Sequence, residues 1–174
     1  TMQLAERTGV RPFQAAVITL SDKGAQGQRK DESGPAIVKR LEEQGYQVVE
    51  ALLLADEQAV LQKQLIRLCD QRQLDLILTT GGTGFAPRDV TPEATMAVAH
   101  RNAPGIAEAI RAASMCITPR AMLSRGVSVI RGKTLIVNLP GSPKAVQESM
   151  DVFLDVIPHA LTLLRGEGGE CARK

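Results

Sequence analysis

The sequence predicts a three-layer α/β/α domain, in which helices cover both faces of a mainly parallel, partly mixed central sheet. Three observations predict this fold class: strand-like and helix-like segments alternate, a short apolar run is typical of a strand buried on both faces, and glycine turns open new helices. The 174 residues are 44% hydrophobic and 23% charged, as in one globular domain. We therefore expect a single domain over 1–174, with flexible ends at 1–12 and 166–174.

The first part of the chain predicts a β–α–β unit followed by a second helix. Residues Gln14–Leu20 and 46–54 have the composition of strands, and 33–44 between them that of a helix. Asp56 can cap the next helix, expected over 57–71, because leucines recur there at helical spacing.

The next strand leads into a glycine turn. An apolar run at 76–78 ends in two threonines, and three glycines within 81–84 then allow backbone amides to approach a ligand closely. Pro92 suits the first position of a helix with Thr91 as its cap. Asp89 then lies just outside a helix N-terminus, which is a place that attracts phosphates.

The last part of the chain predicts two helices, a hairpin and a long final helix. The helices are expected over 92–100 and 105–115, and the hairpin strands over 127–131 and 134–138. The final helix should run from 143 to about 165, with Pro158 marking a kink or an early stop.

Four strand ends carry glycines or polar side chains that this architecture brings to one edge of the sheet. These are Ser21 with Asp22, Asp56, the segment 81–89, and the segment 138–142. In the last of them, a turn at Gly141 leads to Ser142 as a cap, Pro143 at the first helical position and Lys144 in the first turn. This pattern indicates either a second anion site or simply a well-capped helix.

Asp56 and Asp89 have two interpretations. Either aspartate alone can be a helix cap or satisfy nearby amides. Two carboxylates beside phosphate-binding loops would repel a polyphosphate unless a divalent cation lay between them, and Mg²⁺ favours one or two carboxylates plus substrate phosphates. We therefore expect a Mg-nucleotide site that needs no protein nucleophile, because the ion and the loop amides stabilise the transferring phosphoryl group.

Other chemistries are disfavoured. Pro87 stands where the dinucleotide fingerprint requires its third glycine, and a Gly-Lys-Ser or Gly-Lys-Thr phosphate loop is absent from the sequence. Ser21 and Ser142 have no histidine near them in sequence, and no GxSxG motif is present. His100 and His159 fall in helical segments and are interpreted as surface or packing residues.

Composition restricts the partners and the compartment. Twenty-one basic and nineteen acidic side chains give a net charge of +2 without a dense basic run, so nucleic acid is not the expected partner. Cys69, Cys116 and Cys171 lack metal-site spacing, and their odd number fits a reducing cytoplasm. The sequence shows no membrane-length apolar run, and its first residues lack the apolar core of a signal peptide, so we do not expect export.

Five segments together resemble one known family. They are VITLSD at 17–22, LADEQ at 54–58, TTGGTGFAPRDVTPEAT at 79–95, AMLSRG at 121–126 and NLPGSPKA at 138–145. In this order they closely resemble the molybdopterin adenylyltransferase family, which includes Mog-type proteins and gephyrin-type G domains. The similarity extends from about residue 14 to 166, and the ordered set is far more specific than any one motif.

The resemblance implies transfer of AMP from Mg-ATP to the terminal phosphate of molybdopterin, with release of pyrophosphate. It implies that Asp56 and Asp89 are the essential carboxylates and the Mg²⁺ ligands. It also implies a homotrimer and a hand-off of the product to a molybdate-insertion protein. The substrate-binding and nucleotide-binding residues would be Ser21, Asp22, Gly81, Gly82, Thr83, Gly84, Arg88, Asn138, Pro140, Gly141, Ser142 and Lys144.

The competing hypothesis is a catalytically weak molybdopterin-binding paralogue that acts as a carrier or scaffold. Both Asp56 and Asp89 are present, which favours the enzyme. Relatives vary at the position of Ser142, so the resemblance does not make its hydroxyl catalytic.

Overall fold

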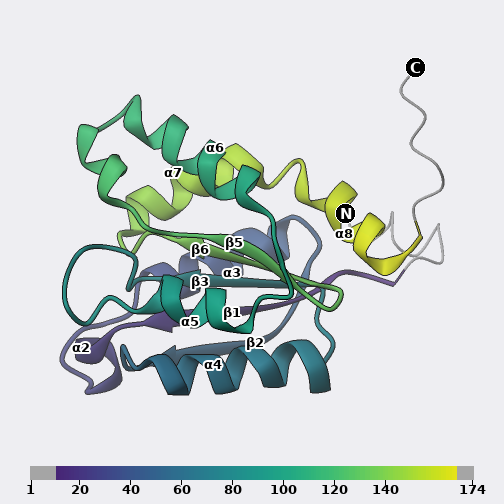
Figure 1. Ribbon diagram of the computed structural model, residues 1–174, viewed down its shortest axis with the longest axis horizontal. Helices are drawn as coiled ribbons and strands as arrows, with labels where there is room; N and C mark the ends of the chain where they lie inside the picture. Colours follow the sequence, from purple (N-terminus) through teal and green to yellow (C-terminus); the bar gives the residue numbers. More distant parts are fainter. Residues whose placement is uncertain (1–10, 168–174) are drawn as a thin grey trace.

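The computed structural model describes residues 11–167, which form a six-stranded sheet between two layers of helices (Figure 1). The strand order is β2-β1-β3-β6-β5-β4. The first four of these are parallel neighbours, whereas β5 is antiparallel to both β6 and β4. The predicted mixed sheet and three layers are therefore confirmed. The strands are β1 (Gln14–Leu20), β2 (Gln47–Leu54), β3 (Leu76–Thr80), β4 (Arg101–Asn102), β5 (Ser128–Arg131) and β6 (Thr134–Leu139).

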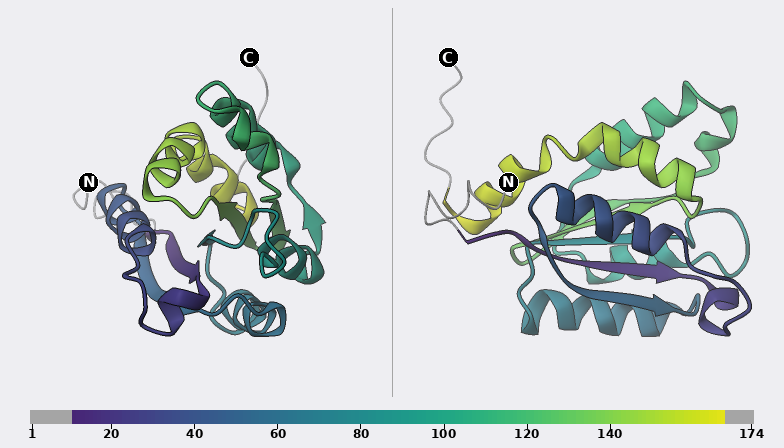
Figure 2. Two further views of the ribbon diagram at one scale, coloured as in Figure 1. Left: turned by 90° about the vertical axis from the view of Figure 1, so that its left-hand side faces the viewer. Right: turned by 180° about the vertical axis from the view of Figure 1, so that it is seen from behind.

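Helices pack on both faces of the sheet (Figures 1 and 2). One face is covered by α3 (Ser33–Glu43), α6 (Pro104–Met115), α7 (Pro143–Phe153) and α8 (Ile157–Arg165). The other is covered by α4 (Gln58–Ile66), its π-helical extension η1 (Arg67–Gln71) and α5 (Thr91–Val98). Two short helices complete the described chain, α2 (Asp22–Ala25) and the 3-10 helix η2 (Pro119–Leu123).

Strand β1 shows how the apolar runs generate two cores. Ala15 and Val17 belong to the core beneath α3 and α7, and Ala16 and Ile18 belong to the core against α4 and α5. Successive side chains of a strand point to opposite faces, so an unbroken apolar run suits a strand with helices on both sides.

The edges of the sheet differ in length. Strand β2, with eight residues, forms one edge, and β4, with two residues, forms the other. In the middle of β2, the Glu50 carboxylate accepts hydrogen bonds from Arg67 and Arg72.

Several predicted helix ends are wrong. Helix α4 starts at Gln58 after Glu57, and Asp56 does not cap it. Thr91 is the first residue of α5 rather than its cap, and its hydroxyl donates to the carbonyl of Gly81 instead. Both side chains are engaged by neighbouring strand ends, which are contacts that local sequence rules do not include.

The predicted final helix is two helices. Helix α7 ends at Phe153, and α8 begins at Ile157 with Pro158 in its first turn. Proline lacks an N–H and has a helical φ, so here it starts a second helix instead of kinking one. Helix α2, strand β4 and helix η2 were not predicted, because two to five residues are too few for a periodic pattern.

An ion pair lies at the edge of the sheet opposite the strand C-termini. The Arg165 guanidinium donates to both carboxylate oxygens of Asp75, at 2.8 Å each, and to the carbonyls of Arg11 and Pro12. It also lies over the Phe13 ring. Burial alone would raise the pKa of Asp75, but the hydrogen bonds from Arg165 and Gln14 outweigh it, and the pKa is lowered. Much of the two ends expected to be flexible lies outside the described residues, as does Cys171.

Among residues 11–167, no helix combines the length and the apolar character that crossing a bilayer requires.

Candidate active site

The carboxyl ends of four parallel strands meet at one edge of the sheet, at the left of Figure 1 where α2 lies. Strand β1 is flanked by β2 and β3, so the connections leave it in opposite directions and create a switch point. The loops are joined by main-chain hydrogen bonds, from Ser21 N to Leu54 O at 2.9 Å and from Gly81 N to Leu139 O at 3.3 Å.

Asp22 and Asp56 bind each other's main chain. The Asp22 amide donates to Asp56 Oδ2, and the Asp56 amide donates to Asp22 Oδ1, both at 3.0 Å. Arg88, from the loop after β3, donates to both carboxylate oxygens of Asp22 at 2.9 Å. The hydrogen bond from Arg88 lowers the pKa of Asp22, so this carboxylate stays ionised.

Asp56 has the opposite electrostatic environment. Its Oδ1 is buried and has no hydrogen-bond partner among the described residues. Burial raises the pKa of Asp56, the amide of Asp22 opposes the shift, and the negative charges of Asp22 and Asp89 add to it. A buried carboxylate oxygen without a donor is costly unless a cation or a proton meets it.

The glycine turn after β3 has no space for side chains. Gly81 has φ +92°, and a Cβ there would lie 2.4 Å from the Leu20 carbonyl oxygen. A Cβ on Gly82, with φ +68°, would lie 2.3 Å from Thr91 Oγ1 and 3.0 Å from Asp56 Oδ1. Glycine is therefore required for the close approach of this turn to both strand ends.

We expect Gly81→Ala to destabilise the protein much more than Gly132→Ala. Both glycines have positive φ, a conformation that costs an L-residue about 1–2 kcal/mol. Only Gly81 would also meet a neighbouring strand, whereas a Cβ on Gly132 meets nothing within 4 Å. Urea unfolding of the two variants measures the difference. Equal losses of unfolding free energy would contradict the close approach.

A cavity of about 400 Å³ opens beside these loops. Ser21 lines it from the end of β1, and Ser33 lines it from the start of α3. Ser33 Oγ donates to the Gly141 carbonyl, and Ser142 Oγ accepts from the Ala145 amide, so the predicted cap of α7 is confirmed. Two basic residues, Arg29 and Lys30, and two acidic residues, Asp31 and Glu32, also line the cavity, so the charges of its lining balance.

Comparison with known proteins establishes the family to which this site belongs. A family model described as a probable molybdopterin binding domain matches residues 16–159.

The chain belongs to this molybdopterin-binding family.

It is 42% identical over 152 residues to the molybdopterin adenylyltransferase of Helicobacter pylori, covering 86% of each chain. The solved structure of the molybdopterin biosynthesis enzyme MoaB from Thermus thermophilus has 48% identity and a TM-score of 0.84, covering 88% of this chain and 97% of that one. The molybdopterin biosynthesis Mog protein from Mycobacterium ulcerans has 42% identity and a TM-score of 0.84, covering 90% and 99%.

The match to the molybdopterin-binding family spans every predicted site residue, and of these Ser21, Gly141 and Ser142 line the cavity. Asn138 is buried, and its amide donates to Thr79 and Thr95 and accepts from Val127, so its contacts join neighbouring elements. Lys144 is exposed and lies 3.9 Å from Glu148, one turn along α7.

Thr83 lies in the glycine turn itself, between Gly82 and Gly84. It is buried, and its carbonyl accepts a hydrogen bond from the Arg125 amide. The other predicted residues meet around the glycine turn or the cavity. These are Ser21, Asp22, Asp56, Gly81, Gly82, Gly84, Arg88, Asp89, Pro140, Gly141 and Ser142.

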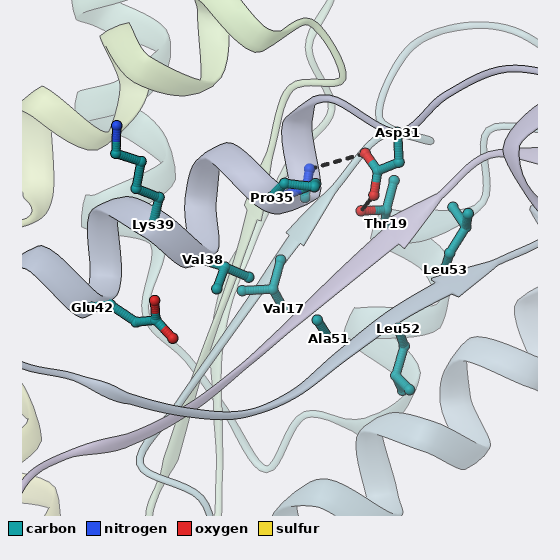
Figure 3. Close-up of a pocket in the computed structure, with 11 residues that line it drawn as sticks. Val17, Thr19, Asp31, Pro35, Val38, Lys39, Glu42, Ala51, Leu52 and Leu53 are labelled. Atoms are coloured by element: carbon teal, nitrogen blue, oxygen red, sulfur yellow. Dashed lines mark hydrogen bonds between the residues drawn. The ribbon is translucent and has the colours of Figure 1, made fainter.

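Sequence reasoning missed several residues that line the cavity, among them Arg29, Lys30, Ser33, Asp31 and Thr19. Asp31 Oδ2 accepts from the Thr19 hydroxyl at 2.7 Å, and Oδ1 accepts from the Gly34 amide at 3.0 Å (Figure 3). Both Asp31 and Thr19 line the cavity and an adjoining groove of about 450 Å³ between α3 and β2. The detectable signal was Asp31 three residues before Gly34, a spacing typical of an aspartate that binds a helix N-terminus.

Proposed function

We propose that this chain is a molybdopterin adenylyltransferase. An oxygen of the terminal phosphate of molybdopterin attacks the α-phosphorus of ATP. A new P–O bond forms, the bond from the α-phosphorus to the bridging oxygen breaks, and pyrophosphate leaves with the electron pair. The observation that carries this proposal is Asp56 Oδ1, which is buried against the turn at Gly82 and has no hydrogen-bond partner in the described part of the chain.

The donor set fits Mg²⁺. Asp56 and Asp89 would hold the ion together with substrate phosphates, which is the mixed coordination that Mg²⁺ prefers. The bound ion would neutralise charge at the transferring phosphoryl group.

The chain's own residues would position the reactants. The absence of side chains at Gly81 and Gly82 lets this turn lie against Leu20, Thr91 and Asp56, which brings the strand ends together around the site. Arg29 and Lys30 would pair with phosphate oxygens that enter the cavity, whose lining also includes Asp31 and Glu32. Such alignment and charge stabilisation are sufficient for phosphoryl-type transfer without a protein nucleophile.

The test is incubation of the purified protein with molybdopterin, ATP and Mg²⁺, followed by mass spectrometry. We expect adenylylated molybdopterin and pyrophosphate, and we expect EDTA to abolish both products. Restoring Mg²⁺ in excess of EDTA should restore them. Bound molybdopterin without adenylylation, while a known family enzyme turns over in parallel, would instead identify a carrier or scaffold.

We further infer a cytoplasmic homotrimer that passes its product to a molybdate-insertion protein. The resemblance to the family supports the trimer and the hand-off, and the three widely separated cysteines support a reducing compartment. Light scattering of the purified protein measures the oligomeric state, and a monomer would contradict the trimer.

A further inference from the structure

We propose that Arg125 is the positioning residue of the active-site loop, which we define as residues 82–90. This inference rests on the proposed function, because its importance for turnover comes from Asp89, which the active-site loop carries. Arg125 lies in the AMLSRG segment, 35 residues after this loop ends, and it touches neither the carboxylate of Asp89 nor that of Asp56 in any hydrogen bond described for residues 11–167.

Arg125 binds the active-site loop at three points. Its main-chain amide donates to the Thr83 carbonyl at 2.9 Å. Its Nε donates to the Gly84 carbonyl at 2.8 Å, and its Nη2 donates to the Asp89 carbonyl at 2.7 Å. One residue therefore fixes both the beginning and the end of the loop, with charge-assisted hydrogen bonds at Gly84 and Asp89.

The same guanidinium also reaches α5. Its Nη1 pairs with Glu93 in the first turn of that helix. The hydrogen bond from Arg125 lowers the pKa of Glu93, which keeps this pair ionised at neutral pH. The Arg125 side chain therefore binds both the active-site loop and α5, the helix that follows it.

Arg125 is itself held in place by a second arginine. Arg111 in α6 donates to the carbonyls of Ser124 and Gly126, at 2.9 Å and 2.8 Å. The main chain on both sides of Arg125 is thus fixed to a helix. A planar guanidinium with several donors suits this bridging, and a lysine could replace only part of it.

The loop has one other long-range side-chain anchor among the hydrogen bonds described for residues 11–167, the pair of Arg88 with Asp22, and its contacts around Asp89 are otherwise short-range. The Asp89 amide donates to the Ala86 carbonyl, and Asp89 Oδ2 accepts from the Ala86 amide. The tip is exposed, with Phe85 at 68%. The position of Asp89 relative to Asp56 consequently depends on where the loop is anchored, and Arg125 is the anchor that binds the main chain of Asp89 itself.

Loss of this anchor should affect turnover more than molybdopterin binding. A displacement of about 1 Å in a catalytic group can cost roughly a hundredfold in rate. The cavity beside α3 is lined by other residues, so it should remain intact without Arg125. We therefore expect Arg125→Ala to lower kcat for adenylyl transfer by roughly a hundredfold and to leave the Kd for molybdopterin within about threefold of wild type, since that side chain is outside the cavity lining.

Arg131→Ala is the matched control. Arg131 also joins a carboxylate to a main-chain carbonyl of α5. It donates to both carboxylate oxygens of Asp70, which lies in η1, and to the carbonyl of Val98, the last residue of α5. It does so at the opposite end of the helix. We expect a comparable loss of thermal stability in the two variants and the loss of kcat only in Arg125→Ala.

Two further readouts separate positioning from general destabilisation. Guanidinium added at millimolar concentration should restore part of the kcat of Arg125→Ala and none in Arg131→Ala. Arg125→Lys should fold and retain an intermediate kcat, because the ammonium can still reach one carbonyl. A kcat of Arg125→Ala equal to that of Arg131→Ala, or no difference between Arg125→Lys and Arg125→Ala, would overturn the proposal.

Trypsin cleavage tests the anchor without any reference to the reaction. Arg88 lies exposed in the active-site loop, and the bond after it becomes accessible when the loop opens. We expect Arg125→Ala to be cut after Arg88 at least about tenfold faster than wild type or Arg131→Ala, as identified by fragment mass. Unchanged cleavage would refute the anchor, whereas faster cleavage in a protein without adenylyl transfer would refute only the proposed function.

Discussion

Asp89→Asn is expected to lower kcat for adenylyl transfer by a hundredfold or more, with molybdopterin still bound. Asparagine keeps an oxygen to accept the Ala86 amide, so the loop should hold its conformation. The substitution removes the negative charge with which Asp89 and Asp56 would together hold Mg²⁺. The enzyme then loses the ion's stabilisation of the charge that develops in the transition state. Single-turnover kinetics with excess enzyme, together with molybdopterin titration, measure the two quantities separately.

Asp70→Asn is the matched control for this substitution. Asp70 is likewise an aspartate whose carboxylate accepts hydrogen bonds, but it lies in η1 and its partner is Arg131. Its replacement should leave kcat close to wild type. Loss of molybdopterin binding in Asp89→Asn, or an unchanged kcat and Mg²⁺ requirement, would show that Asp89 does not act through the metal.

Arg165→Met should lower the free energy of unfolding by about 3 kcal/mol. The substitution keeps an apolar stem against Phe13 but removes the partner of a carboxylate whose side chain is only 6% exposed. Removing one member of a buried pair leaves an uncompensated charge, which is why the cost is large. Urea unfolding measures it, with Arg72→Met as a control that breaks a more exposed pair with Glu50 and should cost at most about 1 kcal/mol.

The pH dependence of this loss has a defined sign. The pKa of Asp75 is lowered in the folded state, so its ion pair stabilises the protein above the ordinary pKa of 3.8, and this contribution disappears as the pH falls through the folded-state value. The difference between wild type and Arg165→Met should therefore be full at pH 7 and shrink below about pH 4. A difference independent of pH would mean that packing, and not charge, accounts for the loss.

The sequence was sufficient to predict the elements that depend only on residues close together in the chain. The apolar runs located β1 and β3, because a strand between two helical layers has no polar face. Ser142 and Pro143 correctly marked the start of α7, since the cap and the first helical position depend only on neighbouring residues.

Residues engaged across strands were not predictable in the same way. Asp56 and Thr91 have the local appearance of caps, but their side chains bind the amide of Asp22 and the carbonyl of Gly81. Asn138 follows an apolar strand and was therefore expected in the pocket, although the structure uses its amide to join β3, α5 and the segment before β5. In each case the deciding partner lies at least ten residues away in sequence, so only the folded chain identifies it.

The unequal edges of the sheet bear on how this protein can misassemble. An edge strand offers free main-chain groups that can template pairing with another chain, and a longer edge is the better template. The two residues of β4 are a poor template for pairing, so intermolecular strand addition would take place along the eight residues of β2. Glu50 interrupts the apolar character of β2 at its centre, held there by Arg67 and Arg72, and a central charge of this kind acts as a gatekeeper against aggregation.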